Sequence, residues 1–149
     1  MNPERTVLCV APHPDDETLG CGGSLLRHAA EGCRGLWLIM SVMDPADGFT
    51  AERIVSREAE IAAVARAYGF TGVHSAGFPT TRLDTVPKSK LIDTVSRVFR
   101  EINPHTVYLP YRNDAHSDHV ATFDAVTACC KSFRYPNIRN VRVYETLSE

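Results

Sequence analysis

The stretch that decides the fold is Thr6-Val7-Leu8-Cys9-Val10-Ala11, a short and mostly apolar run that stops at Pro12. A run of this kind is typical of a strand buried on both faces, as in sheets that helices cover from two sides. The proline favours an extended residue before it and ends the pattern. We therefore predict a buried strand at residues 6–11.

Outward from that strand, strand-like and helix-like patterns alternate to the end of the chain, with no repeat and no linker. Further strands are predicted at 35–41, 73–78, 106–110 and 141–144, and helices at 22–30, 51–68, 87–102 and 120–133. Five strands alternating with helices predict an α/β fold. We expect a Rossmann-like, doubly wound, three-layer sandwich around a mainly parallel five-stranded sheet.

The composition indicates one ordinary globular domain over residues 1–149, with 44% hydrophobic and 23% charged residues. A core of this size buries roughly 68–70% of the surface of the unfolded chain, so folding requires neither a disulfide nor a metal. Sixteen Lys and Arg against eighteen Asp and Glu give a net charge of −2. Since there is no basic stripe for a phosphate backbone, nucleic acid is not expected as a partner.

The sequence shows neither a membrane span nor a secretion signal. Its most apolar stretch, Leu36–Met43, is far shorter than the roughly 18–20 residues of a bilayer helix. Residues 1–5 lack the apolar core of a signal peptide. The five cysteines have no C-x-x-C spacing, and we expect reduced and mostly buried thiols. These features predict a cytoplasmic protein.

Side chains that bind metals gather after two of the predicted strands. His13-Pro14-Asp15-Asp16-Glu17 directly follows the first strand, and 113–119, which contains two aspartates and two histidines, follows the strand at 106–110. In doubly wound sheets ligands bind beyond the carboxyl ends of the strands where the strand order reverses, and the first and fourth strands commonly flank that point. We therefore expect the two clusters to face each other across one crevice.

Two histidines and one aspartate suit a catalytic Zn²⁺ site, which leaves a fourth position for water. The same set also accepts Fe²⁺ or Co²⁺. Hydrolysis needs in addition a carboxylate to take a proton and a hydrogen-bonding or cationic group for the oxyanion. His116 and His119 are three residues apart, so on a helix they project from nearly the same face, one able to bind metal and the other to meet substrate.

Other polar residues have simpler explanations. We interpret the isolated histidines His28, His74 and His105 as ordinary solvated or paired residues. Acids at a helix start, such as Asp114 or Asp118, often serve as caps. The segment 20–23, Gly-Cys-Gly-Gly, lacks the G-x-G-x-x-G spacing of a dinucleotide site, so a tight turn and close helix packing are expected there.

The two clusters and their surroundings resemble the LmbE/PIG-L superfamily of zinc-dependent N-deacetylases. The resemblance is carried by Ala11-Pro12-His13-Pro14-Asp15-Asp16-Glu17, by Leu19-Gly20-Cys21-Gly22-Gly23, and by His116-Ser117-Asp118-His119. It extends over essentially the whole chain and includes Arg57 with Glu60 and the pair Leu83-Asp84. It implies a single LmbE-like deacetylase domain.

The resemblance also implies roles for individual residues. It implies three zinc ligands: His13, Asp16 and His119. Asp15 would act as general base and acid, and His116 would stabilise the oxyanion or protonate the leaving amine, with Asp118 orienting it. The implied substrates are N-acetylglucosamine conjugates or related amides.

Arg57 is a candidate for substrate binding on independent grounds. At ~100° per residue it falls inside the apolar arc of the helix 51–68, where an unpaired cation is costly. Either an ion pair with a buried carboxylate or a contact with sugar hydroxyls or an active-site acid would explain it. Asp84 and Arg82 either line the same pocket or belong to an ordinary turn.

Family members usually continue beyond the segment 141–145 with a C-terminal portion that helps to wall the substrate site, whereas this sequence ends at Glu149. We expect either a truncated chain or a short member with an open site that another subunit of a homo-oligomer closes. Three functions follow: a zinc N-deacetylase of an amino sugar, a zinc amidase for another amide such as a sugar–thiol conjugate, or a non-catalytic metal- or sugar-binding chain.

Overall fold

Five parallel strands form one sheet in the order β3-β2-β1-β4-β5 in the computed structural model. They are β1 (Thr6–Ala11), β2 (Arg34–Val42), β3 (Gly72–Pro79), β4 (Thr106–Pro110) and β5 (Asn140–Tyr144). The structure describes residues 5–147. Residues 1–4, which entered the argument about a signal peptide, and residues 148–149 at the end of the chain lie outside the described residues.

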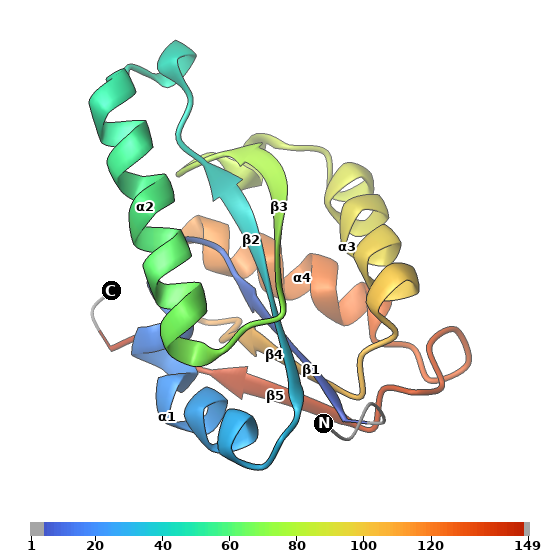
Figure 1. Cartoon of the computed structure of the whole chain (residues 1–149). Coiled ribbons are helices and arrows are strands. Elements are labelled where there is room, and N and C mark those ends of the chain that lie inside the picture. Colours follow the sequence, from blue (N-terminus) through green and yellow to red (C-terminus); the bar gives the residue numbers. More distant parts are fainter. Residues whose placement is uncertain (1–4, 148–149) are drawn as a thin grey trace.

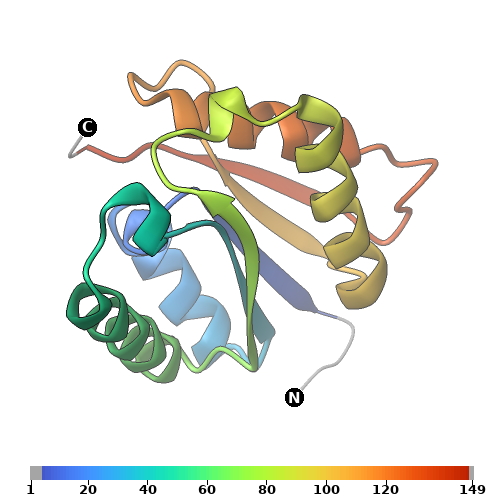
Figure 2. The same ribbon diagram turned by 90° about the horizontal axis from the view of Figure 1, so that it is seen from above.

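Four helices cover the two faces of this sheet (Figures 1 and 2). On one face lie α1 (Asp16–Ala30) and α2 (Ala51–Tyr68), and on the other lie α3 (Lys88–Ile102) and α4 (Ser117–Cys129). Short 3₁₀ turns, η1 (Pro45–Asp47) and η2 (Leu83–Thr85), follow β2 and β3. The predicted three-layer, doubly wound α/β fold is confirmed.

The first strand lies at the centre of both cores. All six of its residues are buried, and its side chains alternate between the two faces. Leu8 and Val10 belong to the core under α3 and α4, whereas Val7 and Cys9 belong to the core under α1. The apolar run that opened the sequence therefore supplies both layers of packing.

Two helices begin earlier than the sequence pattern indicated. The first starts at Asp16 and not at residue 22, and the glycine-rich segment forms a kink at Cys21 (φ −143°) inside it. The last starts at Ser117 and ends at Cys129, where the prediction was 120–133. His116 accounts for its early start, because the imidazole accepts a hydrogen bond from the N–H of Asp118 and caps the helix.

Two of the three glycines of the kinked helix, Gly20 and Gly22, allow the close packing that was expected. A Cβ at Gly20 would overlap the ring of Tyr144, and one at Gly22 would approach the hydroxyl of Tyr68 to 2.5 Å. The hydroxyl of Tyr144 donates to the carbonyl of Val10 at 2.9 Å. The end of β5 is thereby fastened to the centre of the sheet.

Two further expectations were reduced, mostly buried cysteines and the lack of a membrane-spanning segment. All five cysteines are free, and all but Cys130 are buried. Among residues 5–147 no helix combines the length and the apolar character that crossing a membrane requires.

Candidate metal centre and its surroundings

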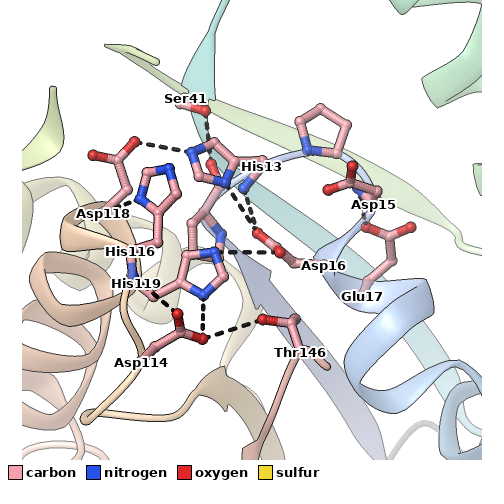
Figure 3. Close-up of polar contacts among 12 residues, drawn as sticks. His13, Asp15, Asp16, Glu17, Ser41, Asp114, His116, Asp118, His119 and Thr146 are labelled. Carbon is pink, nitrogen blue, oxygen red and sulfur yellow. Dashed lines mark hydrogen bonds and ion pairs between the residues drawn. The ribbon is translucent and has the colours of Figure 1, made fainter. Parts of the chain in front are cut away.

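The two predicted clusters meet above neighbouring strands. The central strand pairs in parallel with β4, so the segments that follow Ala11 and Pro110 leave the sheet at the same edge. Figure 3 shows the side chains from these segments pointing toward one another. A cavity lined by His13 and Asp15 after β1 and by His116 after β4 corresponds to the expected crevice.

His13, Asp16 and His119 lie together at the centre of this group. Their ligand atoms fall within 4.8 Å of one another. The two oxygens of Asp16 divide between the histidines, with Oδ1 3.3 Å from His119 Nε2 and Oδ2 3.4 Å from His13 Nδ1. Asp16 is 1% exposed and His119 is fully buried, so this is a preformed internal group of two imidazoles and a carboxylate.

The hydrogen bonds of His119 indicate which of its nitrogens can bind a metal. Its Nδ1 lies 2.9 Å from the carboxylate of Asp114, which can only accept when ionised, so Nδ1 carries the proton. The opposite nitrogen, Nε2, is buried and has no hydrogen-bond partner among residues 5–147. A buried lone pair without a donor fits a metal ligand, with Asp114 as the outer carboxylate that orients it.

Asp114 was not identified as a site residue from the sequence, where it was interpreted as a helix cap. One oxygen does accept the N–H of His116 at 3.0 Å, as in a turn. The other oxygen holds His119 and also accepts the hydroxyl of Thr146 at 3.1 Å. The signal available in the sequence was its place within the second cluster, but the contact from Thr146 depends on the fold alone.

His13 is held in the same way by a second aspartate. Its Nε2 lies 2.9 Å from Asp118 Oδ2, and this buried carboxylate also accepts the N–H groups of Thr81 and Leu83 at 2.8 and 2.9 Å. In the neutral ring the proton lies on Nε2, toward Asp118, and the lone pair of Nδ1 then faces Asp16. The carboxylate of Asp118 thus bonds to His13, whereas the expected partner was His116. The hydrogen bond between Asp118 and His116 is made by the backbone N–H of Asp118.

His116 has the opposite tautomer from His119. Because its Nδ1 accepts the N–H of Asp118 at 3.1 Å, the proton of the neutral ring resides on Nε2. The rings of His116 and His119 stack with centroids 5.2 Å apart. One imidazole therefore offers a lone pair to a metal, while its neighbour offers an N–H donor to the cavity that it lines.

The pKa values of the buried aspartates and histidines depend on two opposing influences. Burial disfavours the charged form of each group, and contacts with groups of opposite charge favour it. Burial lowers the pKa of His13, but the hydrogen bond to Asp118 and the nearby carboxylate of Asp16 outweigh it and raise that pKa to about 9, so a metal ion binds His13 in competition with a proton. Burial raises the pKa of Asp16, but the close contacts of its carboxylate with the rings of His119 and His13, and the N–H of His13, lower that pKa to about 2. The pKa values of Asp114 and Asp118 are lowered, and that of His119 is raised, by the same pairing against burial. The carboxylates are thus ionised and able to bind a cation at neutral pH.

Asp15 is exposed and lines the same cavity as His13 and His116. Its backbone has φ 153°, a region that residues other than glycine rarely adopt. The fully buried carboxylate of Glu17 accepts the Asp15 N–H at 3.0 Å, and the Asp15 carbonyl accepts the N–H groups of Thr18 and Leu19 at 2.9 Å. Burial raises the pKa of Glu17. Glu17 is a positioning residue that sequence reasoning did not single out.

The two predicted substrate-binding residues lie in different places. Arg57 faces inward, as its helical position predicted: it lines the cavity, donates to the carbonyl of Pro14 at 2.9 Å and lies 3.4 Å from Glu60. Asp84 is exposed and lines a separate hollow beside α3 and α4. The N–H of its neighbour Leu83 is bound to Asp118, so the turn points Asp84 away, and in the described chain the two candidates do not share a pocket.

Three features define a candidate metallohydrolase site. They are the doubly wound sheet, the buried His-His-Asp group, and the exposed carboxylate of Asp15 with the half-buried imidazole of His116 at the mouth. A family model described as GlcNAc-PI de-N-acetylase matches residues 8–130, and the chain therefore belongs to the PIG-L family. The resemblance noted from the motifs is confirmed.

Individual relatives agree with this assignment. The chain is 28% identical over 159 residues to a 1D-myo-inositol 2-acetamido-2-deoxy-alpha-D-glucopyranoside deacetylase of Rhodococcus opacus (strain B4), covering 87% of this chain and 54% of the relative. It is 28% identical over 128 residues to a diacetylchitobiose deacetylase of Thermococcus kodakarensis, covering 80% and 46%. The chain thus spans about half the length of these two curated relatives.

A solved structure extends the likeness to three dimensions. The conserved protein TT1542 from Thermus thermophilus superposes with a TM-score of 0.76 at 31% sequence identity. The superposition covers 93% of this chain and 65% of that protein. The two proteins therefore share this fold over almost the whole of this chain.

Proposed function

We propose that this protein is a zinc-dependent hydrolase that removes the N-acetyl group from an N-acetylglucosamine-type amino sugar or its conjugate. The observation that carries the proposal is the buried Nε2 of His119, which lacks a hydrogen-bond partner in residues 5–147 and lies beside Asp16 and His13. Such an atom is costly unless a ligand satisfies it, and a metal ion does so.

The donor set fits a divalent transition metal. His13 Nδ1, His119 Nε2 and a carboxylate oxygen of Asp16 would hold the ion, and two nitrogens with one oxygen suit Zn²⁺, with Fe²⁺ or Co²⁺ as alternatives. A bound ion of this kind supplies Lewis acidity, which makes water a stronger nucleophile and polarises the amide carbonyl. Asp118 and Asp114 orient the two imidazoles from behind.

The exposed Asp15 and the half-buried His116 have complementary tasks. The carboxylate of Asp15 accepts a proton from the attacking water and returns it to the amide nitrogen as the amine leaves. His116, with its proton on Nε2, donates a hydrogen bond to the carbonyl oxygen as negative charge develops there. The backbone N–H of Asp118 keeps that proton on the correct nitrogen, which is the orienting role that we propose for Asp118 toward His116.

The relatives support the choice of substrate class. The curated relatives act, by their names, on amino sugars that carry an acetamido or acetyl group, joined to inositol in one case and to a second sugar in the other. Arg57 lines the cavity at the mouth of the site, where it can contact sugar hydroxyls. An amidase that cleaves another amide, such as a sugar–thiol conjugate, would use the same residues.

Metal content and turnover of a panel of acetylated sugars and thiol conjugates test the proposal. We expect about one Zn²⁺ per chain. Asp15→Asn should retain the metal and lose roughly 10²–10⁴-fold in turnover, the usual contribution of a general base. The matched control is Asp93→Asn on the exposed side of α3, which should change neither. Full turnover in Asp15→Asn would exclude Asp15 as the base, and a zinc-loaded protein that cleaves no amide would favour a non-catalytic role.

A further inference from the structure

A second group of metal-binding side chains lies at the carboxyl-terminal end of α1, away from the proposed hydrolytic site. An imidazole nitrogen of His28, a carboxylate oxygen of Glu31 and the sulfur of Cys33 fall within 4.8 Å of one another. Cys33 Sγ lies 3.7 Å from His28 Nδ1. His28 follows Asp16 by twelve positions on the same helix, a separation of roughly 15–18 Å along it. The group is therefore distinct from the buried His-His-Asp group.

The way in which α1 ends places His28 beside Cys33. Glu31 caps the helix, and Gly32 follows with φ 76°, in the left-handed region. The N–H of Gly32 donates to the carbonyl of Ala29 at 3.0 Å. The N–H of Cys33 donates to the carbonyl of His28, also at 3.0 Å. These are the two hydrogen bonds of a Schellman motif, which turns the chain back over the last helical turn. The backbone itself thus brings the thiol to the imidazole.

A tyrosine of the sheet orients the imidazole of His28. The hydroxyl of Tyr108, on β4, lies 3.0 Å from His28 Nε2, and the two rings meet edge to face with centroids 5.8 Å apart. In the tautomer with the proton on Nε2, the tyrosine oxygen accepts the hydrogen bond and the lone pair of Nδ1 faces Cys33. An outer hydrogen-bond partner on the far nitrogen is typical of metal-binding histidines. In that tautomer the imidazole presents its free nitrogen to an ion that the thiol can share.

Glu31 completes a donor set that suits Zn²⁺ or Co²⁺. Thiolate, imidazole and carboxylate all bind these ions, and three of them leave a fourth position for water. Glu31 is exposed, and it lines with His28 an open hollow beside β5, so an ion can enter from solvent. One oxygen of Glu31 accepts a hydrogen bond from Arg27 at 2.9 Å, but this exposed ion pair is weak and leaves the second oxygen for a metal. The partial negative charge at the end of the helix also favours a cation here.

We propose that His28, Glu31 and Cys33 form a second site for a divalent transition-metal ion such as Zn²⁺ or Co²⁺. The site binds more weakly than the buried group, since the ion has to displace the proton of the thiol and compete with Arg27 for Glu31. It therefore fills only when metal exceeds about one equivalent per chain, the amount assigned to the hydrolytic site. The inference goes beyond the proposed function and does not depend on it, because the two groups share no residue.

The thiolate gives this site a spectroscopic signature of its own. Co²⁺ bound to a thiolate shows a charge-transfer band in the near ultraviolet, and the His-His-Asp group contains no sulfur. Titration of the reduced, zinc-loaded chain with Co²⁺ should produce this band and saturate at about one added equivalent. Cys33→Ser should abolish the band. The matched control Cys130→Ser, at a half-buried free thiol packed against the core under α3 and α4, should keep it.

A chain without the band at saturating Co²⁺, or a band that survives in Cys33→Ser, would overturn the proposal. Because Cys33 is buried, Cys33→Ala takes its place if circular dichroism shows that Cys33→Ser is unfolded. Asp16→Asn, which removes a proposed ligand of the hydrolytic site, should keep the band. If the band is present and the unmodified chain cleaves no amide, the function fails and the second site stands. If amides are cleaved and no band develops, the function stands and the second site fails.

A pair of substitutions tests Glu31 as a ligand. Glu31→Gln and Arg27→Gln break the same exposed ion pair, so an effect that acts through the pair alone would be the same in both. Glu31→Gln should lower the affinity for Co²⁺ by at least the roughly 10- to 100-fold that loss of an outer partner costs. Arg27→Gln frees the carboxylate and should raise the affinity. His28→Gln should lower it as Glu31→Gln does, whereas His74→Gln, at a half-buried histidine of β3, should not. Affinities that change alike in Glu31→Gln and Arg27→Gln would exclude Glu31 and overturn the three-ligand site.

Discussion

Helices α4 and α2 both carry residues of the candidate site, but they differ in how closely they pack against the rest of the protein. The first buries six side chains, among them Asp118 and His119, while the second buries none of its eighteen residues, all of which the structure describes. The tightly packed helix thus carries a proposed metal ligand. The candidate substrate contacts, including Arg57, lie on the loosely packed one.

The difference follows from what each set of groups requires. Buried carboxylates and imidazoles are tolerated only when every polar atom has a partner in good geometry, and such networks require rigid surroundings. Asp118 alone accepts three hydrogen bonds, from Thr81, Leu83 and His13. A substrate surface needs open space instead, and an incompletely covered helix leaves that space.

The largest loss of zinc binding and turnover is expected from a substitution in the buried metal-binding group. Asp16→Asn removes the charge that lies between the two imidazoles, so zinc content measured by mass spectrometry should fall from about one per chain to near zero. Turnover should fall by roughly 10³-fold or more, the scale of several kcal/mol that a Lewis-acid ion contributes. Asp93→Asn, an exposed change of the same type, should retain the metal. Full zinc content in Asp16→Asn would exclude Asp16 as a ligand.

The next largest effect concerns stability. The same Val→Ala change, made once on each helix, compares how tightly α4 and α2 are packed. Val126 on α4 is fully buried and Val64 on α2 is half-buried. Val126→Ala should lower the free energy of unfolding by about 2–3 kcal/mol, because two methyl groups are lost and a cavity remains. Val64→Ala should cost about half as much or less. Urea unfolding measures both, and equal losses would show that α2 is packed as tightly as α4 in solution.

A smaller loss of zinc affinity is expected when the carboxylate that holds His119 is changed. Asp114→Asn keeps the size of the side chain but removes the charge that orients His119, so zinc affinity should fall by about 10- to 100-fold. The control is Asp84→Asn at an exposed aspartate that faces another hollow, and it should leave the affinity unchanged. Competition with a chromogenic chelator measures the two constants. Loss of affinity in Asp84→Asn would place that residue at the site after all.

Much of this arrangement could be predicted because it follows from local pattern. The alternation of strands and helices led to the sheet, and the two clusters of acids and histidines at the ends of strands one and four led to the crevice. The inward position of Arg57 followed from helical periodicity alone. Each of these features depends on residues close together in the sequence and on one general rule of α/β sheets.

The errors have two sources: local backbone and capping geometry that no sequence pattern signals, and contacts that join distant segments. The starts of α1 and α4 were placed too late because the glycines suggested a turn, and because the cap is a histidine, which is not among the usual capping residues. The partner of the Asp118 carboxylate is His13, 105 positions away in the chain. Glu17 was overlooked because its importance depends on the positive φ of Asp15, which no sequence pattern signals.

The smallest predicted effect tests one of those distant contacts. Thr146 is 4% exposed, follows β5, and donates its hydroxyl to the carboxylate of Asp114 at 3.1 Å. Thr146→Val keeps the shape of the side chain and removes one hydrogen bond, worth ~1 kcal/mol, so zinc affinity should fall about fivefold, well short of the effect of Asp114→Asn. Thr146→Ser keeps the hydroxyl and should keep most of the affinity. If Thr146→Val and Thr146→Ser behave alike in the chelator competition, the segment after β5 supports the site by packing alone. If only Thr146→Ser keeps the affinity, the rigid side of the molecule extends from α4 through Asp114 to the segment that follows β5.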